Sequence, residues 1–210
     1  YLGRALQTVN PPNASVGNSQ VAASIITGQT ALGATPADTD ELLISDAGTL
    51  KRVDYSYLKS ANTPAFDARA SSNQTGLTSG GWTKVQFDTE LFDVGGGYDA
   101  TNDKFVVPSG EAGKYFFTTF AKINSAGGSA TLLGTGMRFT KNGSNIKQAI
   151  HFPANGSNIA EGKGVNCVLD LAVSDYIEVY AYYQDNGGGT GSITGSSDFD
   201  TYFTGFKLIG

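Results

Sequence analysis

Three observations predict that this chain is an all-β protein. Glycine is abundant, with 28 residues among 210, and the chain holds 10 tyrosines and 12 phenylalanines, whereas only 16% of residues are charged. Aromatic residues favour strands and glycine favours the turns between them. Apolar residues also alternate along the chain: Val165, Cys167, Leu169, Leu171 and Val173 fall on one face of a predicted strand. The length allows one full core and a smaller appendage.

Residues 1–60 differ from the remainder, because they are small, polar and weakly patterned. The exception is Glu41–Ser45, which alternates and is followed by a turn signal at residues 46–48. We therefore expect a β-hairpin over 41–54 within an extended stalk or neck, and a head over 61–210. A two-stranded hairpin is marginal in water, so it should pack against copies of itself or against the head. A linker with an accidental hairpin is the alternative.

Two predicted strands are apolar on both faces. In residues 114–123, Tyr115 and Phe117 share one face and two phenylalanines lie on the other, and in residues 175–183 three tyrosines lie opposite Ile177 and Val179. One face can fill a core while the other presents rings outward, and a large exposed aromatic surface usually marks an interface. The predicted subunit interface comprises Phe116, Phe120, Tyr176, Tyr180 and Tyr182.

Composition argues against several classes of function. The net charge is -5 and the pI is about 4.8, with no basic stripe for a phosphate backbone, so nucleic acid is not an expected partner. No apolar run approaches the roughly 20 residues that span a bilayer. The single cysteine, Cys167, excludes an intrachain disulfide and is expected to fill the core.

The sequence does not predict an enzyme or a cofactor. The only histidine, His151, has no cysteine or acidic neighbour in sequence that would suggest a zinc motif or a catalytic triad. The triplets Gly95–Gly97 and Gly187–Gly189 open no helix and lack the Lys-Ser/Thr of a phosphate-binding loop, so they are interpreted as hairpin ends.

A series of motifs in residues 85–117 resembles the first half of the C1q globular head, and the end of the chain carries the terminal F-x-G-F-x-L pattern of that family. The first series is Phe87-Asp88, Tyr98-Asp99, Lys104-Phe105, Pro108, Gly113, Tyr115 and Phe117. The terminal pattern is Phe203, Gly205, Phe206 and Leu208. The resemblance covers about residues 64–210. It implies a ten-stranded antiparallel jelly-roll sandwich of the C1q and tumour-necrosis-factor type, assembled as a homotrimer with both termini at one end.

The neck resembles a different group of proteins. Residues 39–59 are similar to neck segments of bacteriophage tail fibres and other virion appendages, and residues 1–60 lack the Gly-X-Y repeat of the collagen stalks of animal relatives. The resemblances together imply an extracellular virion appendage, a tail fibre or spike tip. It would attach to other virion proteins through its stalk and to a bacterial surface glycan or protein through its head. The alternatives are a structural capsid or tail decoration and a secreted cellular adhesion protein or lectin.

Strand counting predicts where a ligand would bind. If successive strands are antiparallel, three short turns lie at the stalk end, and the longer connections near 95–103, 124–130, 154–163 and 185–198 lie at the other end. Polar groups there suit a hydroxyl-rich ligand. They are Tyr98, Asn124, Asn155, Asn158, Asp185, Asn186, Ser196 and Asp198. Good loop-forming chemistry explains the same composition. Acidic loop residues supply oxygen atoms that suit calcium, but solvated carboxylates explain them as well, and no metal site is predicted.

Overall fold

The computed structural model describes residues 21–58, 62–127, 130–153, 158–196 and 200–208. Contacts divide the chain into two compact units, one up to residue 59 and one from residue 60 onward. The elements of the first unit are α1 (Ser24–Thr27), β1 (Glu41–Asp46), β2 (Thr49–Asp54) and the 3-10 turn η1 (Tyr55–Tyr57). Within the described ranges, no helix has the length and apolar character that crossing a membrane requires.

Strands β1 and β2 form an antiparallel hairpin. Its turn places Ala47 and Gly48 at φ 49° and 82°, two consecutive left-handed residues, and glycine adopts this conformation without steric cost. Large apolar side chains remain exposed on both of its faces. These are Leu42, Leu43, Ile44 and Leu50. Nothing within the described part of this unit covers them, so the hairpin lacks the packed face that stabilises a two-stranded ribbon.

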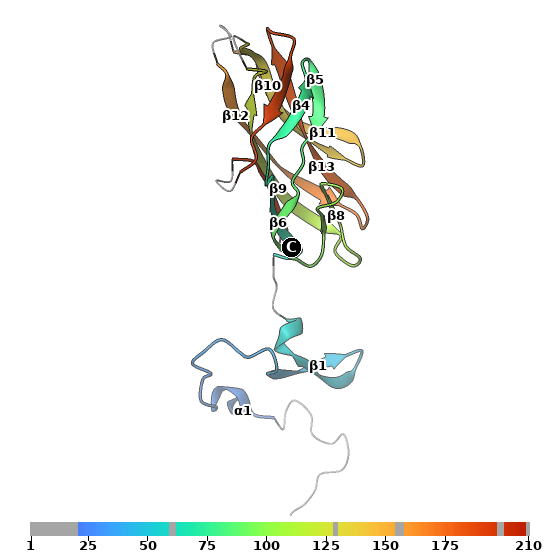
Figure 1. The fold of residues 1–210 in the computed structure, drawn as a ribbon. Coiled ribbons are helices and arrows are strands. Elements are labelled where there is room, and N and C mark those ends of the chain that lie inside the picture. The colour runs from blue at the N-terminus through green and yellow to red at the C-terminus, as the bar shows by residue number, and fades with distance from the viewer. Residues whose placement is uncertain (1–20, 59–61, 128–129, 154–157, 197–199, 209–210) are drawn as a thin grey trace, which may run out of the picture. The chain divides into compact units, whose positions relative to one another are not determined.

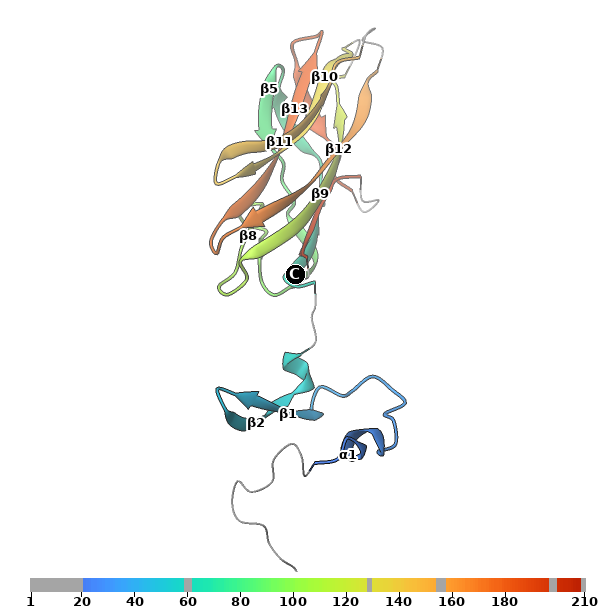
Figure 2. The same cartoon turned by 180° about the vertical axis from the view of Figure 1, so that it is seen from behind.

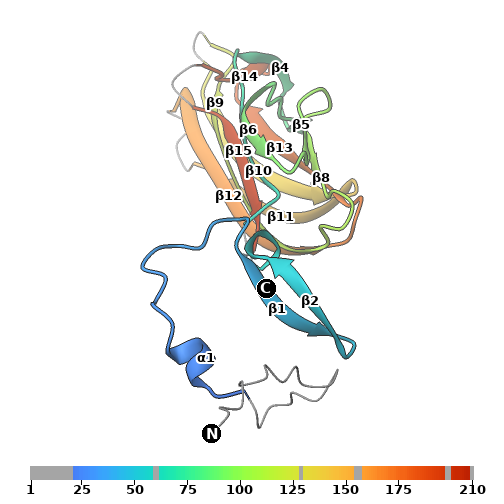
Figure 3. The ribbon, with the colours of Figure 1, turned by 90° about the horizontal axis from the view of Figure 1, so that it is seen from below.

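The second unit is a sandwich of two antiparallel sheets (Figures 1 and 3). Sheet I has six strands: β11 (Ser144–His151), β10 (Leu132–Lys141), β13 (Tyr176–Asp185), β8 (Lys104–Val106) and β7 (Tyr98–Asp99) in that order, with β5 (Gly81–Lys84) also paired to β13. Sheet II has seven: β4 (Gln74–Thr78), β14 (Thr190–Ile193), β9 (Gly113–Asn124), β15 (Tyr202–Lys207), β3 (Ala65–Arg69) and β6 (Thr89–Val94), with β12 (Ala160–Leu171) on β9.

The prediction of an all-β jelly-roll sandwich is confirmed, although the described strands of the head outnumber the ten expected. The excess lies between residues 65 and 106, where turns divide the chain into six short strands, β3 to β8. Glycines with positive φ, such as Gly80 at the β4–β5 turn and Gly95 after β6, mark these breaks. Short strands of this kind give too few alternating residues to be recognised from sequence.

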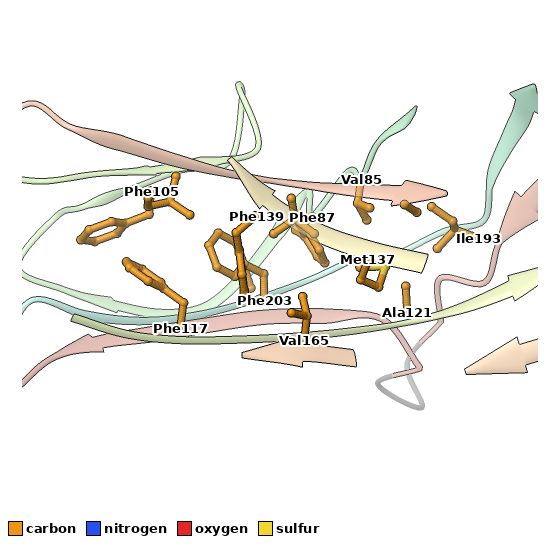
Figure 4. Close-up of a cluster of buried hydrophobic side chains, with 14 of the residues drawn as sticks. Val85, Phe87, Phe105, Phe117, Ala121, Met137, Phe139, Val165, Ile193 and Phe203 are labelled. Carbon is orange, nitrogen blue, oxygen red and sulfur yellow. The ribbon is translucent and has the colours of Figure 1, made fainter. Parts of the chain in front are cut away.

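The core lies between the two sheets and combines aromatic rings with aliphatic side chains (Figure 4). Phe105 of sheet I and Phe117 of sheet II face each other with ring centroids 5.5 Å apart, and Phe66 stacks on Phe105 at 5.2 Å. Cys167 packs against this cluster, as its place in the alternation predicts. Burial raises the pKa of the Cys167 thiol to about 11, so the side chain stays neutral and behaves as an apolar group.

Hydrogen bonds place three short turns at one end of the sandwich and three longer connections at the other, as strand counting predicts. The end with the short turns is called the near end, and the opposite end is called the far end. At the near end, Ser174 N donates to Val107 O at 3.0 Å and Leu208 N to Lys114 O at 2.7 Å, so this end also carries the last described residue. At the far end, Ser125 N donates to Ile159 O at 2.8 Å and Asn186 N to Thr131 O at 3.1 Å. The far-end connections therefore form one group of loops.

The segment 95–103 is the exception, and its predicted place was wrong. Strand β6 returns along β3, with Val94 opposite Ala65, so Gly95 lies next to Pro64 at the near end. Short strand β7 then pairs with β8, and β8 pairs with β13. The additional reversal between the short strands β7 and β8 upset the count on which the prediction depended.

Gly205, in the middle of β15, allows the rings of Phe66 and Phe117 to pack against the strand backbone. A Cβ atom at this position would lie 2.5 Å from Phe117 Cδ1 and 2.8 Å from Phe66 Cε1, and both rings are fully buried. We expect Gly205→Ala to lower the free energy of unfolding by about 1–3 kcal/mol, because the rings must leave their positions to admit the methyl group. Chemical denaturation of the head measures this, and an unchanged midpoint would contradict the packing described.

Candidate functional site

The outward face of sheet II carries two pairs of aromatic side chains, with Thr118 and Thr204 between them. Phe116 of β9 lies opposite Phe206 of β15, with ring centroids 5.5 Å apart, and Phe120 stacks on Tyr202 at 6.1 Å. On the other side of β9, Val168 of β12 lies opposite Phe116 and is 57% exposed. The strands β9 and β12 run side by side on this face (Figure 2). The four aromatic residues and Val168 are called the aromatic face below.

Two glycines of β12 allow the rings to lie flat across the sheet. A Cβ atom at Gly162 would approach Phe120 Cζ to 2.4 Å, and one at Gly164 would lie 3.4 Å from Phe120 Cδ2. The Phe120 ring therefore covers backbone that would otherwise be bare. Glycine weakens a strand by itself, so a ring packed over it restores part of the lost contact area.

Ion pairs border the aromatic face at both ends. Lys114 Nζ lies 2.9 Å from Asp170 Oδ2 toward the near end, and Lys122 Nζ lies 3.6 Å from Asp200 Oδ2 toward the far end. Beyond β3, on strand β6, Phe92 and Val94 are 47% and 52% exposed. An apolar centre with a polar margin is the usual composition of a protein interface.

The predicted interface residues do not form one surface. Phe116 and Phe120 belong to sheet II, whereas Tyr176, Tyr180 and Tyr182 point outward from β13 in sheet I, on the opposite side of the sandwich. The alternation was interpreted correctly for each strand, but strand order separates the two sets. Sequence reasoning missed Tyr202, Phe206 and Val168, although Phe206 belongs to the terminal motif and has parity opposite to the buried Phe203.

Asp185 organises the far-end loops and is not available to a ligand. It is only 6% exposed, its Oδ1 accepts a hydrogen bond from Gly188 N at 3.0 Å, and its Oδ2 accepts from the Tyr183 hydroxyl. Its own backbone N donates to Ser79 Oγ at 3.0 Å. Burial opposes ionisation of this carboxyl, but the hydrogen bonds outweigh it and lower the pKa of Asp185.

Other predicted ligand residues are divided among several environments. Asn186 is exposed and its Oδ1 accepts from Thr131 N at 2.8 Å, while Asn158 is exposed with its carbonyl bonded to Leu132 N. Asn124 is half-buried, and its amide donates to Thr194 Oγ1 at 2.8 Å. Ser196 is half-buried. Asn155 and Asp198 lie outside the described residues.

A groove of about 430 Å³ lies among the far-end loops. Its lining consists of Ala126, Gly127, Ala130, Asn186, Gly187 and Gly189. The small side chains keep the groove open, and the Asn186 side chain adds an amide donor, since its Oδ1 already accepts from Thr131 N. Of the predicted ligand residues that the structure describes, Asn186 alone lines this groove.

The prediction that Tyr98 contacts a ligand was wrong. Tyr98 is 7% exposed, its ring stacks on Phe66 at 4.9 Å, and its hydroxyl donates to Phe87 O at 2.9 Å. Burial raises the pKa of this phenol well above its usual value. The error follows from the misplacement of segment 95–103. Tyr98 starts strand β7 at the near end, and its side chain points into the core.

Among the described residues, no group of three or more histidine, cysteine, aspartate and glutamate side chains is placed to hold a metal ion. His151 lies at the end of β11, where its Nδ1 is 2.8 Å from Glu161 Oε1. Lys163 Nζ lies 2.8 Å from the same oxygen, and Thr135 Oγ1 donates to Glu161 Oε2 at 2.6 Å. These contacts join the edges of the two sheets and occupy the carboxylate.

Comparison with known proteins identifies the head. The C1q domain model matches residues 65–208. The chain belongs to the C1q domain family. C1q-domain proteins form trimers and often bind ligands.

Solved structures resemble the same part of the chain. Murine APRIL at pH 5.0 has a TM-score of 0.50 and 16% sequence identity, covering 69% of this chain and 98% of APRIL. The globular domain of the zebrafish complement 1qA protein has a TM-score of 0.49 and 14% identity, covering 70% and 98%. The likeness to APRIL shows the fold alone. A search of curated protein sequences finds no match.

The Asp185 network gives the head a pH-dependent stability. Because the pKa of Asp185 is lower in the folded head than the value near 4 of a free aspartate, its contribution is present above that value and is lost as the pH falls through the folded pKa. We expect Asp185→Ala to cost about 1–3 kcal/mol at pH 7. Thermal unfolding at pH 7 and near pH 2 tests this, because the difference between variant and wild type should shrink in acid. A difference that persists unchanged would contradict the assignment.

Proposed function

We propose that this chain forms a homotrimeric binding head on an N-terminal neck, and that it serves without catalysis as a virion appendage, a tail fibre or spike tip. In this proposal the head attaches the particle to a bacterial surface glycan or protein, and the neck joins other virion proteins. The single observation that carries the trimer is the aromatic face of sheet II. The virion context is supported by the similarity of residues 39–59 to neck segments of tail fibres.

Burial of the aromatic face supplies a physical cause for association. Phe116, Phe120, Tyr202 and Phe206 each retain partial exposure although they are aromatic and adjacent. Removing such rings from water stabilises an assembly by about 25 cal/mol for each Å² of apolar surface. A closed ring of three subunits buries the same surface on every copy, which leaves no open edge for further growth.

The hairpin unit also exposes apolar surface that association could bury. Leu43 and Leu50 lie on one face of the two-stranded ribbon and are 73% and 71% exposed, and Leu42 and Ile44 are exposed on the other face. Association of three necks would cover part of this surface. A shared axis would then join neck and head in one oligomer and multiply weak receptor contacts into avidity.

Receptor attachment is assigned to the far-end loops, where the groove beside Asn186 presents small residues and a side-chain amide. Hydrogen-bonding groups of this kind suit hydroxyl-rich or peptide ligands. A purely structural role, in which the head caps and trimerises a stalk, is the competing function. It requires the trimer but no attachment.

Charged substitutions on the aromatic face test the trimer. We expect the wild-type chain to sediment as a trimer at micromolar concentration, and Phe116→Lys with Phe120→Lys to sediment as a monomer, because a buried interface does not accommodate unpaired ammonium groups. Ile146→Lys, on sheet I and 37% exposed, is the matched control and should stay trimeric. A monomeric wild type, or a trimeric double variant, would refute the proposed interface.

Adsorption separates an attachment protein from a structural cap. We expect fluorescently labelled trimer to bind whole cells of at least one bacterium in a broad panel, and Asn186→Trp to weaken that binding at least about tenfold by filling the groove. Lys51→Ala, in the hairpin, provides the control for labelling and charge. Failure of the wild type to bind any cell or arrayed glycan would favour the structural role.

A further inference from the structure

The outward face of sheet I carries a second aromatic surface that the proposed trimer does not use. Trp82 of β5 lies opposite Tyr182 of β13, with ring centroids 5.4 Å apart, and the ring of Phe152, which follows β11, lies 6.1 Å from that of Tyr182. Arg138 of β10 lies opposite Tyr180 on β13. These five residues are called the platform below.

Glycines of β10 make the platform flat. A Cβ atom at Gly134 would lie 2.8 Å from two carbons of the Phe152 ring and 3.1 Å from Tyr182 Cε1. One at Gly136 would lie 2.9 Å from a side-chain carbon of Ile150. Because a central strand lacks side chains at both positions, neighbouring rings can lean across it.

Arg138 is held in place without an acceptor for its charge. Its Cζ lies 4.3 Å from the centroid of the Trp82 ring and 5.0 Å from that of Tyr180, so the guanidinium sits between two aromatic faces. Its Nε is buried without a hydrogen-bond partner, and no described carboxylate forms an ion pair with it. Desolvation also lowers the pKa of Arg138, so the surroundings do not compensate its charge fully.

The neighbouring carboxylate, Glu178, is paired with another residue and does not form an ion pair with Arg138. Glu178, on the same face of β13, is 2.6 Å from Lys84 Nζ and also accepts the Tyr180 hydroxyl at 3.4 Å. Gln148 lies opposite Arg138 on β11 and carries no charge. The platform therefore has one uncompensated positive charge beside four aromatic rings.

A guanidinium with unpaired donors binds a carboxylate through two parallel hydrogen bonds. The faces of aromatic rings carry partial negative charge, which suits the polarised C–H groups on the flat side of a sugar ring. Planar polar side chains at the margin, such as Gln148 and Gln184, can bond hydroxyl groups. A polyphosphate is disfavoured by the net charge of -5 of the whole chain.

We propose that the platform of sheet I is a binding site for a carboxylate-bearing glycan, with Arg138 holding the carboxylate and Trp82 and Tyr182 stacking on the sugar ring. This site is distinct from the far-end groove and does not require it. It lies on the side of the sandwich opposite the aromatic face of sheet II, so a trimer that buries that face does not consume it.

Trp82 is the only tryptophan of the chain, so its fluorescence reports directly on the platform. The probes are oligosaccharides containing glucuronic, galacturonic or sialic acid, each compared with its carboxyl-reduced form, and polyglutamate. We expect a saturable change in emission with at least one acidic oligosaccharide, about tenfold weaker binding of its reduced form, and no saturable change with polyglutamate. Equal binding of polyglutamate would replace the glycan site with a general polyanion site and overturn the proposal.

Variants test whether binding of the acidic oligosaccharide depends on Arg138. Arg138→Gln should weaken binding of the acidic oligosaccharide at least about tenfold and abolish its preference over the reduced form, whereas Arg138→Lys should retain part of that preference. Arg52→Gln, in the hairpin, removes the same charge elsewhere and should change nothing. Sedimentation and thermal unfolding of each variant confirm that it is folded and assembled.

The outcomes separate this proposal from the proposed function. No saturable change with any acidic oligosaccharide, or equal affinities for Arg138→Gln and Arg52→Gln, overturns the platform even if the trimer adsorbs to cells. Saturable binding that depends on Arg138 supports the platform even if Asn186→Trp has no effect on adsorption.

Discussion

The period-two alternation of strand β9 is the constraint on which both the core and the outer surface of sheet II depend. Tyr115 and Phe117 point into the sandwich, and Phe116 and Phe120 point out. A shift of one residue in its register would exchange the two faces and turn Lys114 and Lys122 toward the core. The strand lies between β12 and β15, so both neighbours hold this register through continuous ladders of hydrogen bonds.

Glycine and aromatic residues act as partners throughout the head. Gly205 admits the rings of Phe66 and Phe117 inside the core, Gly162 lies beneath Phe120 on one outer face, and Gly134 lies beneath Phe152 on the other. Glycine in a strand lowers its stability, but rings laid across the bare backbone recover apolar contact. The abundance of both residue types thus reflects packing as well as turns.

The sandwich separates three surfaces with different chemistry. The aromatic face of sheet II is apolar and bordered by ion pairs, which suits contact between subunits. The far-end groove presents small residues and amide groups held in position by Asp185, while the platform of sheet I combines rings with the uncompensated charge of Arg138. A binding head that presents different surfaces in different directions can assemble and bind at the same time.

The sequence by itself determined which side chains face the core, because alternation is local and the inward residues of β9, β12 and β13 could be identified within each strand. The family motifs, including Gly205 and Phe206, determined the fold class, because each motif is also a local pattern of a few residues. Only the tertiary structure decided that Phe116 and Tyr180 lie on opposite sheets and that Tyr98 is buried. Strand order and the short reversals between β3 and β8 depend on pairing between residues far apart in the chain, which no local pattern records. The isolation of Arg138 between Trp82 and Tyr180 likewise required three strands, β5, β10 and β13, to be brought together.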